Sequence, residues 1–482
     1  MRRTTFICLV AWAILILFLP TAFMSQTTPK PAASPVSTPP SPSVTPVTVA
    51  TPAAADTTRQ PVTVPNSVRA NDAQTPISLS SAVDQALKQV STYQGTQLNV
   101  RIAQEDVNQA RAAFKPKVTA PLDFIYTSPS AGAARPRPPS FIAANAVTEF
   151  QALVTAAGEI DTSGKLAATL RKNQALVASA RAGSEVARRD LAQAVTDAYY
   201  ALALSTVKRR GAETNLQTAQ DFEHNVQLNL DAGEVAPVDL VRARLQTSAR
   251  EDELALALAE ESVNGDSLRI LIGLDFGTPI NVDDLLLQIP VDAEIERFSD
   301  AAMSSRPELK LIEADRQAAE ADVALARADR KPQVSYSFST GFDSDSMLPR
   351  PLVDHTGVQA TIGVTIPIFD WGISRSKERQ AQFRVQQQDK LRELALRQFA
   401  QAFYSARTQA LFARDRVRRL AASIRDAETN VTTSIARYRS GEAPISEVVD
   451  AQNQLVTTRQ AYYQALFDYQ TAKARLARAS GQ

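Results

Sequence analysis

The chain repeats one pattern at a fixed distance along its sequence. The segment Gly233–Ala243 recurs as Gly441–Ala451, and Gly273 recurs as Gly481, so both landmarks are 208 residues apart (233 to 441 and 273 to 481). A constant offset at two landmarks indicates a duplicated unit, and an internal repeat of this length fixes the architecture of a chain. Each copy is predicted to hold a helix, a turn and a second helix with an acidic residue just after the turn.

The composition favours long helices in one body of two halves. The chain has 482 residues, a formal net charge of +1, 6% aromatic residues and only 16 glycines. Alanine, leucine, glutamine, arginine and glutamate dominate its middle, and these residue types favour helix. The neutral charge balance gives no electrostatic reason to expect nucleic acid as a partner. We expect two structural repeats, residues 77–275 and 276–482, each with a helix, two strands and a pair of long helices.

The N-terminus is predicted to direct export. Residues 1–25 read as a secretory signal peptide, because two arginines precede an apolar core that is short for a membrane span. An uncleaved anchor is the alternative. Cys8 is the only cysteine and lies inside this core, so the mature chain would carry no cysteine to lipidate.

A proline-rich segment follows the signal. Residues 26–76 are rich in Pro, Thr and Ser, with ten prolines between residues 27 and 66. Proline at this density prevents helix and packs poorly, so we expect a disordered tether here, with the folded part beginning near Ile77.

The spacing of apolar residues and the proline-free stretches predict the helices. Each half is predicted to contain a pair of long helices. A helix of about 65 residues, as predicted after Gly164, would be ~100 Å long and would need lateral packing to persist. Pro237 and Asp239 are good start signals for the helix that returns from the first turn. The predicted helices are Leu79–Phe114 with Ser78 as its cap, Gly164–Leu230, Val238–Leu271, Ser305–Arg330, a long helix between Phe369 and Ala443, and a return helix at the end of the chain.

Alternation of apolar and polar residues predicts two strands in each half. Each strand has one apolar face and one small, polar face. The predicted strands are Val118–Tyr126, a weaker one within Ala146–Thr155, Val334–Ser339 and Val358–Ile368, joined by the loops Ser128–Ser140 and Gly341–Thr356.

The strands have the length and the flanking residues of membrane-crossing strands. About ten residues cross a bilayer as a tilted strand. Aromatic residues collect near the strand ends, as in an interfacial girdle: Tyr126, Phe342, Phe369 and Trp371. Four strands cannot close a barrel, and unpaired backbone groups are costly in lipid, so we expect three copies to supply twelve strands. A soluble sheet that rests its apolar face on a core is the alternative.

The pattern resembles the TolC-type outer membrane efflux proteins over residues 77–481. The most specific segments are Gly357–Gly372, which leads into Gln380-Ala381-Gln382, and Ala465–Leu476, together with the two turns in which an acid follows the glycine by six residues. The resemblance implies a mainly α protein with a membrane β-barrel: a trimeric, 12-stranded barrel, four strands per chain, on a long α-helical periplasmic barrel.

The resemblance also implies a function and partners. The chain would be the outer membrane exit duct of a tripartite efflux or type I secretion system, passing substrates from the periplasm to the exterior. Its partners would be two further copies in a homotrimer, outer membrane lipid, a periplasmic adaptor (membrane fusion) protein and an inner-membrane pump of RND, ABC or MFS type.

The residues carried over from the family all lie at the two turns. The turns themselves would form the adaptor-docking tips: Gly233, Glu234, Val235, Ala236, Gly441, Glu442, Ala443 and Pro444. The periplasmic gate and entrance would use residues at fixed distances from the two glycines: Asp239, Tyr438, Glu447 and Asp450. Ala443 stands where some family members have an arginine, so arginine-centred closing bonds cannot form here as they do there.

Simpler interpretations of these residues and of the whole chain remain open. An acid in a first helical turn is favoured by the helix dipole alone, and Tyr438 could serve packing. An enzyme is not expected, because the only histidines, His224 and His355, lie in no metal or triad arrangement; no cofactor is expected either. A soluble periplasmic coiled-coil tether or adaptor without a membrane barrel is the other class, and fractionation would separate it from a barrel protein.

Overall fold

The computed structural model describes residues 76–131, 140, 142, 146–291, 293–299 and 306–481. All of them belong to the second of two compact units, residues 61–482. The predicted signal peptide and the tether up to residue 75 lie outside the described residues.

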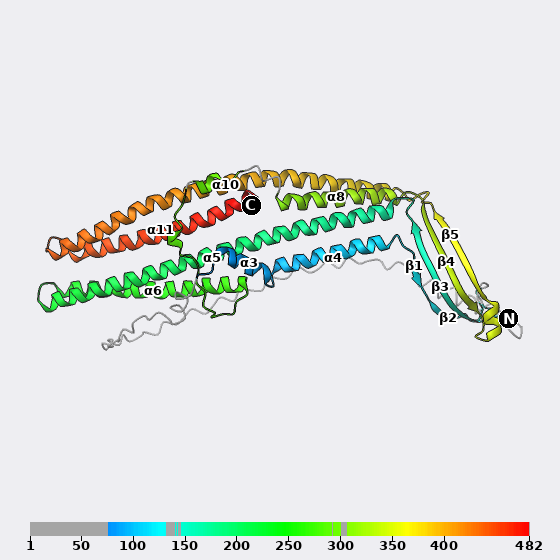
Figure 1. The fold of residues 1–482 in the computed structure, drawn as a ribbon, viewed down its shortest axis with the longest axis horizontal. Coiled ribbons are helices and arrows are strands. Elements are labelled where there is room, and N and C mark those ends of the chain that lie inside the picture. The colour runs from blue at the N-terminus through cyan, green and yellow to red at the C-terminus, as the bar shows by residue number, and fades with distance from the viewer. Residues whose placement is uncertain are drawn as a thin grey trace, which may run out of the picture. The chain divides into compact units, whose positions relative to one another are not determined.

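The described part consists of long helices and one antiparallel sheet (Figure 1). The elements of the first half are α3 (Leu79–Lys88), α4 (Thr92–Ala112), β1 (Lys117–Thr119), β2 (Leu122–Tyr126), β3 (Thr148–Ile160), α5 (Lys165–Asp231) and α6 (Pro237–Ile272). Those of the second half are η2 (Leu285–Leu287), α7 (Ala293–Glu296), α8 (Pro307–Ala328), β4 (Gln333–Ser344), α9 (Pro349–Asp354), β5 (Thr356–Thr365), α10 (Ile373–Arg439) and α11 (Ile445–Ala479).

The two long helices repeat each other in length and in the way they begin. α5 and α10 are both 67 residues long, and each follows a glycine in the left-handed conformation, Gly164 (φ 82°) and Gly372 (φ 85°). An aspartate caps each start: Asp161 accepts from the backbone N–H groups of residues 166 and 167, and Asp370 from those of residues 372 and 374. At 1.5 Å per residue each helix is ~100 Å long. α5 therefore agrees with the prediction Gly164–Leu230 to within one residue at each end.

The predicted helix Leu79–Phe114 is wrong as a single element. Ser78 caps α3 as expected, accepting from the backbone N–H of Ser81 at 3.3 Å. The chain then leaves helical geometry at Gln89, and Val90, assigned to the buried face by its spacing, is 100% exposed. The break lets α3 contact both α5 and α6, whereas α4 runs along α5. Tertiary packing overrides a helical pattern here.

The first predicted strand is interrupted at its proline. β1 and β2 both pair with β3 in one continuous register, in which Thr119 lies opposite Thr155 and Leu122 opposite Ala152. Pro121 has no backbone N–H to give to the ladder, although its carbonyl oxygen still accepts from Leu153 at 3.3 Å. The sheet therefore has four strand positions, in the order β1/β2, β3, β4, β5, and every neighbouring pair is antiparallel.

Three further strand predictions need new bounds. β3 extends to Ile160, five residues beyond the predicted end, because it pairs with β4 from Phe150 to Ile160. β4 continues to Ser344 into the predicted loop Gly341–Thr356, and the rest of that segment contains the short helix α9. β5 ends at Thr365 rather than Ile368. Part of the predicted loop Ser128–Ser140 lies outside the described residues.

The two faces of the sheet differ in chemistry. The even-numbered positions of all strands lie on one face, and most of its large side chains are exposed, Ile362 to 75%. The odd-numbered positions carry mostly Ser, Thr, Gln, Gly and acidic residues. The strands contact each other and α9. Within the described residues of one chain, the apolar face therefore does not pack on a hydrophobic core. This disagrees with the alternative of a soluble sheet. The exposed apolar residues of the even-numbered face are Val118, Leu122, Phe124, Tyr126, Val154, Ile160, Phe338, Val358, Ile362 and Val364.

The main core lies away from the sheet, where α3, α5, α10 and α11 meet the segment between α6 and α8. Tyr199 and Tyr469 are its largest fully buried rings. The hydroxyl of Tyr199 donates to a carboxylate oxygen of Asp283 at 2.9 Å and accepts from the backbone N–H of that residue, also at 2.9 Å. The connection between the halves is thereby fixed to α5.

Candidate functional site: the two helical tips

Both helix pairs end in the same turn, at the end of the helices away from the sheet (Figure 1). Gly233 (φ 77°) and Gly441 (φ 75°) adopt the left-handed conformation that glycine tolerates without strain. In the first tip the backbone N–H of Glu234 donates to the backbone carbonyl of Asn229 at 2.9 Å. In the second tip the backbone N–H of Glu442 donates to the backbone carbonyl of Arg437, also at 2.9 Å. These bonds are the 6→1 bonds of a Schellman motif. The two tips are therefore copies in their backbone hydrogen bonds as well as in sequence.

The structure brings the two tips together. Ile445, the first residue of α11, is buried in one cluster with Val226, Leu240 and Ala243 of the α5–α6 pair. A pocket of about 340 Å³ lies between the tips, and both turns line it. Residues that are 208 apart in sequence thus form one local structure.

Tyr438 lies inside this contact. Its ring packs against Phe222, with 6.1 Å between the ring centroids, and it borders the buried cluster. Its hydroxyl is buried and has no hydrogen-bond partner among the described residues. Burial raises the pKa of Tyr438, and the nearby Asp239 carboxylate adds to the shift. The hydroxyl is therefore protonated at neutral pH and available as a donor.

The three predicted acids differ in their surroundings. Asp239 is half-buried in the first turn of α6, with Arg242 at 3.9 Å. Glu447 occupies the equivalent position of α11 and forms an ion pair with Arg437 within the same tip. Asp450 is exposed, one turn further along α11. Arg437, which sequence reasoning did not single out, thus contacts Glu447, and Arg242 lies next to Asp239.

The remaining tip residues are mostly exposed. Val235 is half-buried, and Ala443 is buried at the edge of the pocket between the tips. The exposed tip residues are Gly233, Glu234, Ala236, Gly441, Glu442 and Pro444. These six are available to a partner molecule.

A polar seam that the sequence did not reveal joins the two helix pairs above the tips. The side-chain amide of Gln246 on α6 donates to that of Gln452 on α11, and both residues are buried. Arg250 bonds Asn453 in the same seam. The pairing could not be found from the repeat, because the residue equivalent to Gln246 is Gln454 rather than Gln452.

No group of three or more His, Cys, Asp or Glu side chains in the described part could hold a metal ion. Within the same residues no helix is long and apolar enough to cross a membrane.

Comparison with known proteins assigns the chain to a family. The family model for outer membrane efflux proteins matches residues 82–274 and 298–482. The chain is 25% identical over 415 residues to protein CyaE of Bordetella pertussis, covering 84% of each chain. It is 23% identical to the outer membrane efflux protein BepC of Brucella suis, over 84% of this chain and 85% of BepC.

A solved structure agrees with the fold. The crystal structure of the outer membrane protein VceC from Vibrio cholerae matches with a TM-score of 0.73 and 18% identity, covering 84% of this chain and 96% of VceC. The family match covers most of the chain and includes both helix pairs and both tips. The chain is an outer membrane protein and belongs to the outer membrane efflux protein family.

Proposed function

We propose that three copies of this chain form the exit duct of a tripartite efflux or type I secretion system. The observation that supports this most directly is the sheet, which has two open edges and exposes its apolar face. In lipid such edges would leave backbone groups unpaired, at several kcal/mol each. Three sheets joined edge to edge would remove every open edge and give twelve antiparallel strands.

The aromatic residues support a membrane position for the sheet. Tyr126 and Phe342 lie near its loop end, whereas Phe369 and Trp371 follow β5 at the helix end, with 4.7 Å between their ring centroids. Aromatic girdles at both interfaces are typical of membrane barrels. The apolar face would then meet lipid, and the small, polar face would line the lumen.

The tips support the proposed entrance. With threefold symmetry, Asp239, Glu447 and Asp450 would each occur three times around the axis at the periplasmic end. The exposed parts of both turns would receive the adaptor protein, and an inner-membrane pump of RND, ABC or MFS type would deliver the substrate. One of the relatives, BepC, is named an outer membrane efflux protein. This name favours export as the direction of transport.

Detergent extraction followed by light scattering tests the assembly, and planar bilayers test the duct. The protein should be extracted from membranes only with detergent, have three times the mass of one chain, and give channel conductance after reconstitution. A folded monomer, or a trimer that conducts no ions even with its tips truncated, would contradict the proposal.

A further inference from the structure

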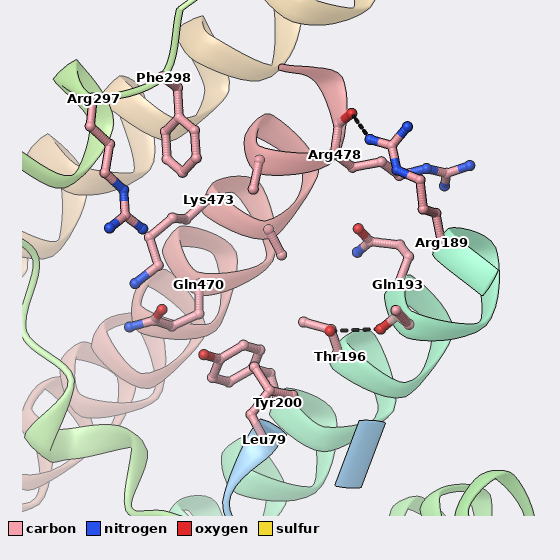
Figure 2. A pocket seen from close by; sticks show the side chains of 13 residues that line it. Leu79, Arg189, Gln193, Thr196, Tyr200, Arg297, Phe298, Gln470, Lys473 and Arg478 are labelled. Atoms are coloured by element: carbon pink, nitrogen blue, oxygen red, sulfur yellow. Dashed lines mark hydrogen bonds between the residues drawn. The ribbon is translucent and has the colours of Figure 1, made fainter. Parts of the chain in front are cut away.

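A pocket outside the tips lies between the middle of α5 and the end of α11 (Figure 2). It has a volume of about 270 Å³ and is also bordered by Leu79 of α3 and by residues 297 and 298. Four cationic side chains line it and, among the described residues, no carboxylate does. These cations are Arg189, Arg297, Lys473 and Arg478. The chain as a whole has a net charge of only +1, so its overall composition does not explain why positive charges cluster here.

On one side of the pocket, Lys473 and Arg297 lie near a single carboxylate, that of Glu294. Glu294 accepts from the Lys473 ammonium at 3.0 Å and from the hydroxyl of Tyr469 at 2.9 Å. Although burial alone would raise it, these two bonds and the nearby Arg297 hold the pKa of Glu294 below its ordinary value. Arg297 itself lies over the ring of Phe298, 5.0 Å from its centroid. Two positive charges therefore face one negative charge here.

The cations on the other side of the pocket are paired, and Arg189 also donates to the carbonyl oxygen of Arg478 at 2.7 Å. Glu308 contacts Arg189 at 3.4 Å and Arg306 at 3.0 Å, and Arg478 pairs with Asp190. Burial lowers the pKa of Arg189, and the neighbouring arginines lower it further.

Tyr200 supplies a neutral donor at the floor of the pocket. It is only 7% exposed, and its hydroxyl points into the pocket (Figure 2). Burial raises the pKa of Tyr200 to about 12, with smaller contributions from Asp283 and Glu294, so the hydroxyl keeps its proton at neutral pH. No hydrogen bond joins this hydroxyl to another described residue. The hydroxyl can therefore donate to an acceptor bound in the pocket.

We propose that this pocket binds a small oxyanion, a phosphate or a carboxylate group, beside Lys473 and Arg297, with the Tyr200 hydroxyl donating to it. Charge-assisted hydrogen bonds of this kind are shorter and stronger than neutral ones. The site does not belong to the proposed gate, and binding there can be measured whether or not the trimer conducts.

Isothermal titration calorimetry of the full-length protein in detergent tests the site. Sodium phosphate and sodium citrate are titrated separately at constant ionic strength, with sodium chloride as the reference. Saturable binding of either anion supports the proposal, and the anion that binds more tightly distinguishes phosphate from carboxylate chemistry. If neither binds more tightly than chloride to protein whose circular dichroism is that of a folded helical chain, the proposal is overturned.

Two substitutions locate the binding. Tyr200→Phe removes one hydroxyl and keeps the packed ring, and Arg297→Gln removes an exposed charge; each should weaken binding about tenfold. Arg392→Gln, which removes an exposed arginine on α10, is the matched control and should leave the affinity unchanged. An adventitious surface effect would lower the affinity equally in all three variants and would refute the assignment.

Discussion

At the scale of single residues, the duplicated tips share a backbone but differ in side chains. Tyr438 stands where the first tip has Leu230, and Ala443 where it has Val235, each 208 residues away (230 to 438 and 235 to 443). The Schellman hydrogen bonds are the same in both tips. Since glycine and the backbone form the turn, the side chains were free to diverge. The aromatic ring and its unpaired hydroxyl are therefore features of the second tip alone.

Replacing Tyr438 should distinguish packing from hydrogen bonding in the closed state. Tyr438→Ala removes a half-buried ring from the contact between the tips, at a cost of about 1–2 kcal/mol to that contact. Resting conductance in planar bilayers should rise accordingly. Tyr438→Phe keeps the ring, and because the hydroxyl has no partner in the described chain, conductance should stay at the parent value. If Tyr438→Ala also behaves like the parent, the ring does not hold the gate.

Removing the acids of α11 should reduce cation selectivity. Glu447→Gln together with Asp450→Asn would take six negative charges from a threefold entrance, and the local potential that concentrates cations would weaken. Reversal potentials across a salt gradient should shift toward the non-selective value, and block by multivalent cations should weaken. Asp426→Asn, an exposed acid on α10, is the control. Unchanged selectivity in the double variant would leave Glu447 and Asp450 as ordinary helix-start residues.

At the scale of elements, two positive-φ glycines determine where the long helices reverse. Glycine favours this short turn, because an L-residue in the left-handed conformation costs about 1–2 kcal/mol. The register of each return helix follows, since Pro237 and Ile445 begin α6 and α11 at equivalent positions. The placement of the predicted gate residues thus depends on these glycines.

Alanine at the turn glycines should loosen the tips. Gly233→Ala and Gly441→Ala should each destabilise the turn by about 1 kcal/mol, visible as faster hydrogen–deuterium exchange in peptides that span it. Gly95→Ala in α4 is the matched control, because an added methyl group meets nothing within 4 Å and alanine favours helix by about 0.5–1 kcal/mol. Exchange should slow in α4 in that variant. Equal exchange in all variants would show that the turns tolerate alanine.

The two faces of β5 should respond differently to charge. Ile362→Lys places an ammonium on the apolar face and should cost about 2–4 kcal/mol if that face meets lipid near the bilayer midplane. Thr361→Lys places the same group on the polar face, where water could solvate it. The yield of folded trimer in outer membrane fractions should fall only for Ile362→Lys. Equal yields would mean that the apolar face is not in contact with lipid.

At the scale of the whole molecule, one chain does not complete the sheet. β1/β2 is one edge and β5 the other, and their directions allow β5 of one copy to join β1/β2 of the next as an antiparallel pair. An exposed edge is a site for strand addition. We therefore expect neighbouring copies to meet along these two strands.

Cysteine cross-linking would detect that contact. Thr119→Cys is combined in turn with Gln359→Cys, Thr361→Cys and Gly363→Cys, all on the polar face, and at least one pair should give linked dimers and trimers on a non-reducing gel. The single-cysteine variants are the controls and should give none. If no pair cross-links in protein that light scattering shows to be trimeric, the copies associate through their helices instead.

Much of the architecture followed from the sequence because local rules govern it. Helices α5, α6 and α8 were predicted to within a few residues, and α10 and α11 lie in the segments predicted for them, since proline, glycine and capping residues mark the ends of helices. The turn conformation at Gly233 and Gly441 follows from glycine itself. The alternation of apolar and polar residues likewise gave the two faces of the sheet. These are properties that neighbouring residues impose on one another.

The tertiary structure decided whatever depends on residues that are distant in sequence. The break at Gln89 occurs because α3 must contact α6 as well as α5, and β3 reaches Ile160 because β4 lies beside it. Contact between Tyr438 and Phe222, the Gln246–Gln452 bond and the cationic pocket around Tyr200 all join different helices. Helical periodicity gives the face on which each residue lies, but only packing, through burial and charge pairing, selects the partner on the other helix.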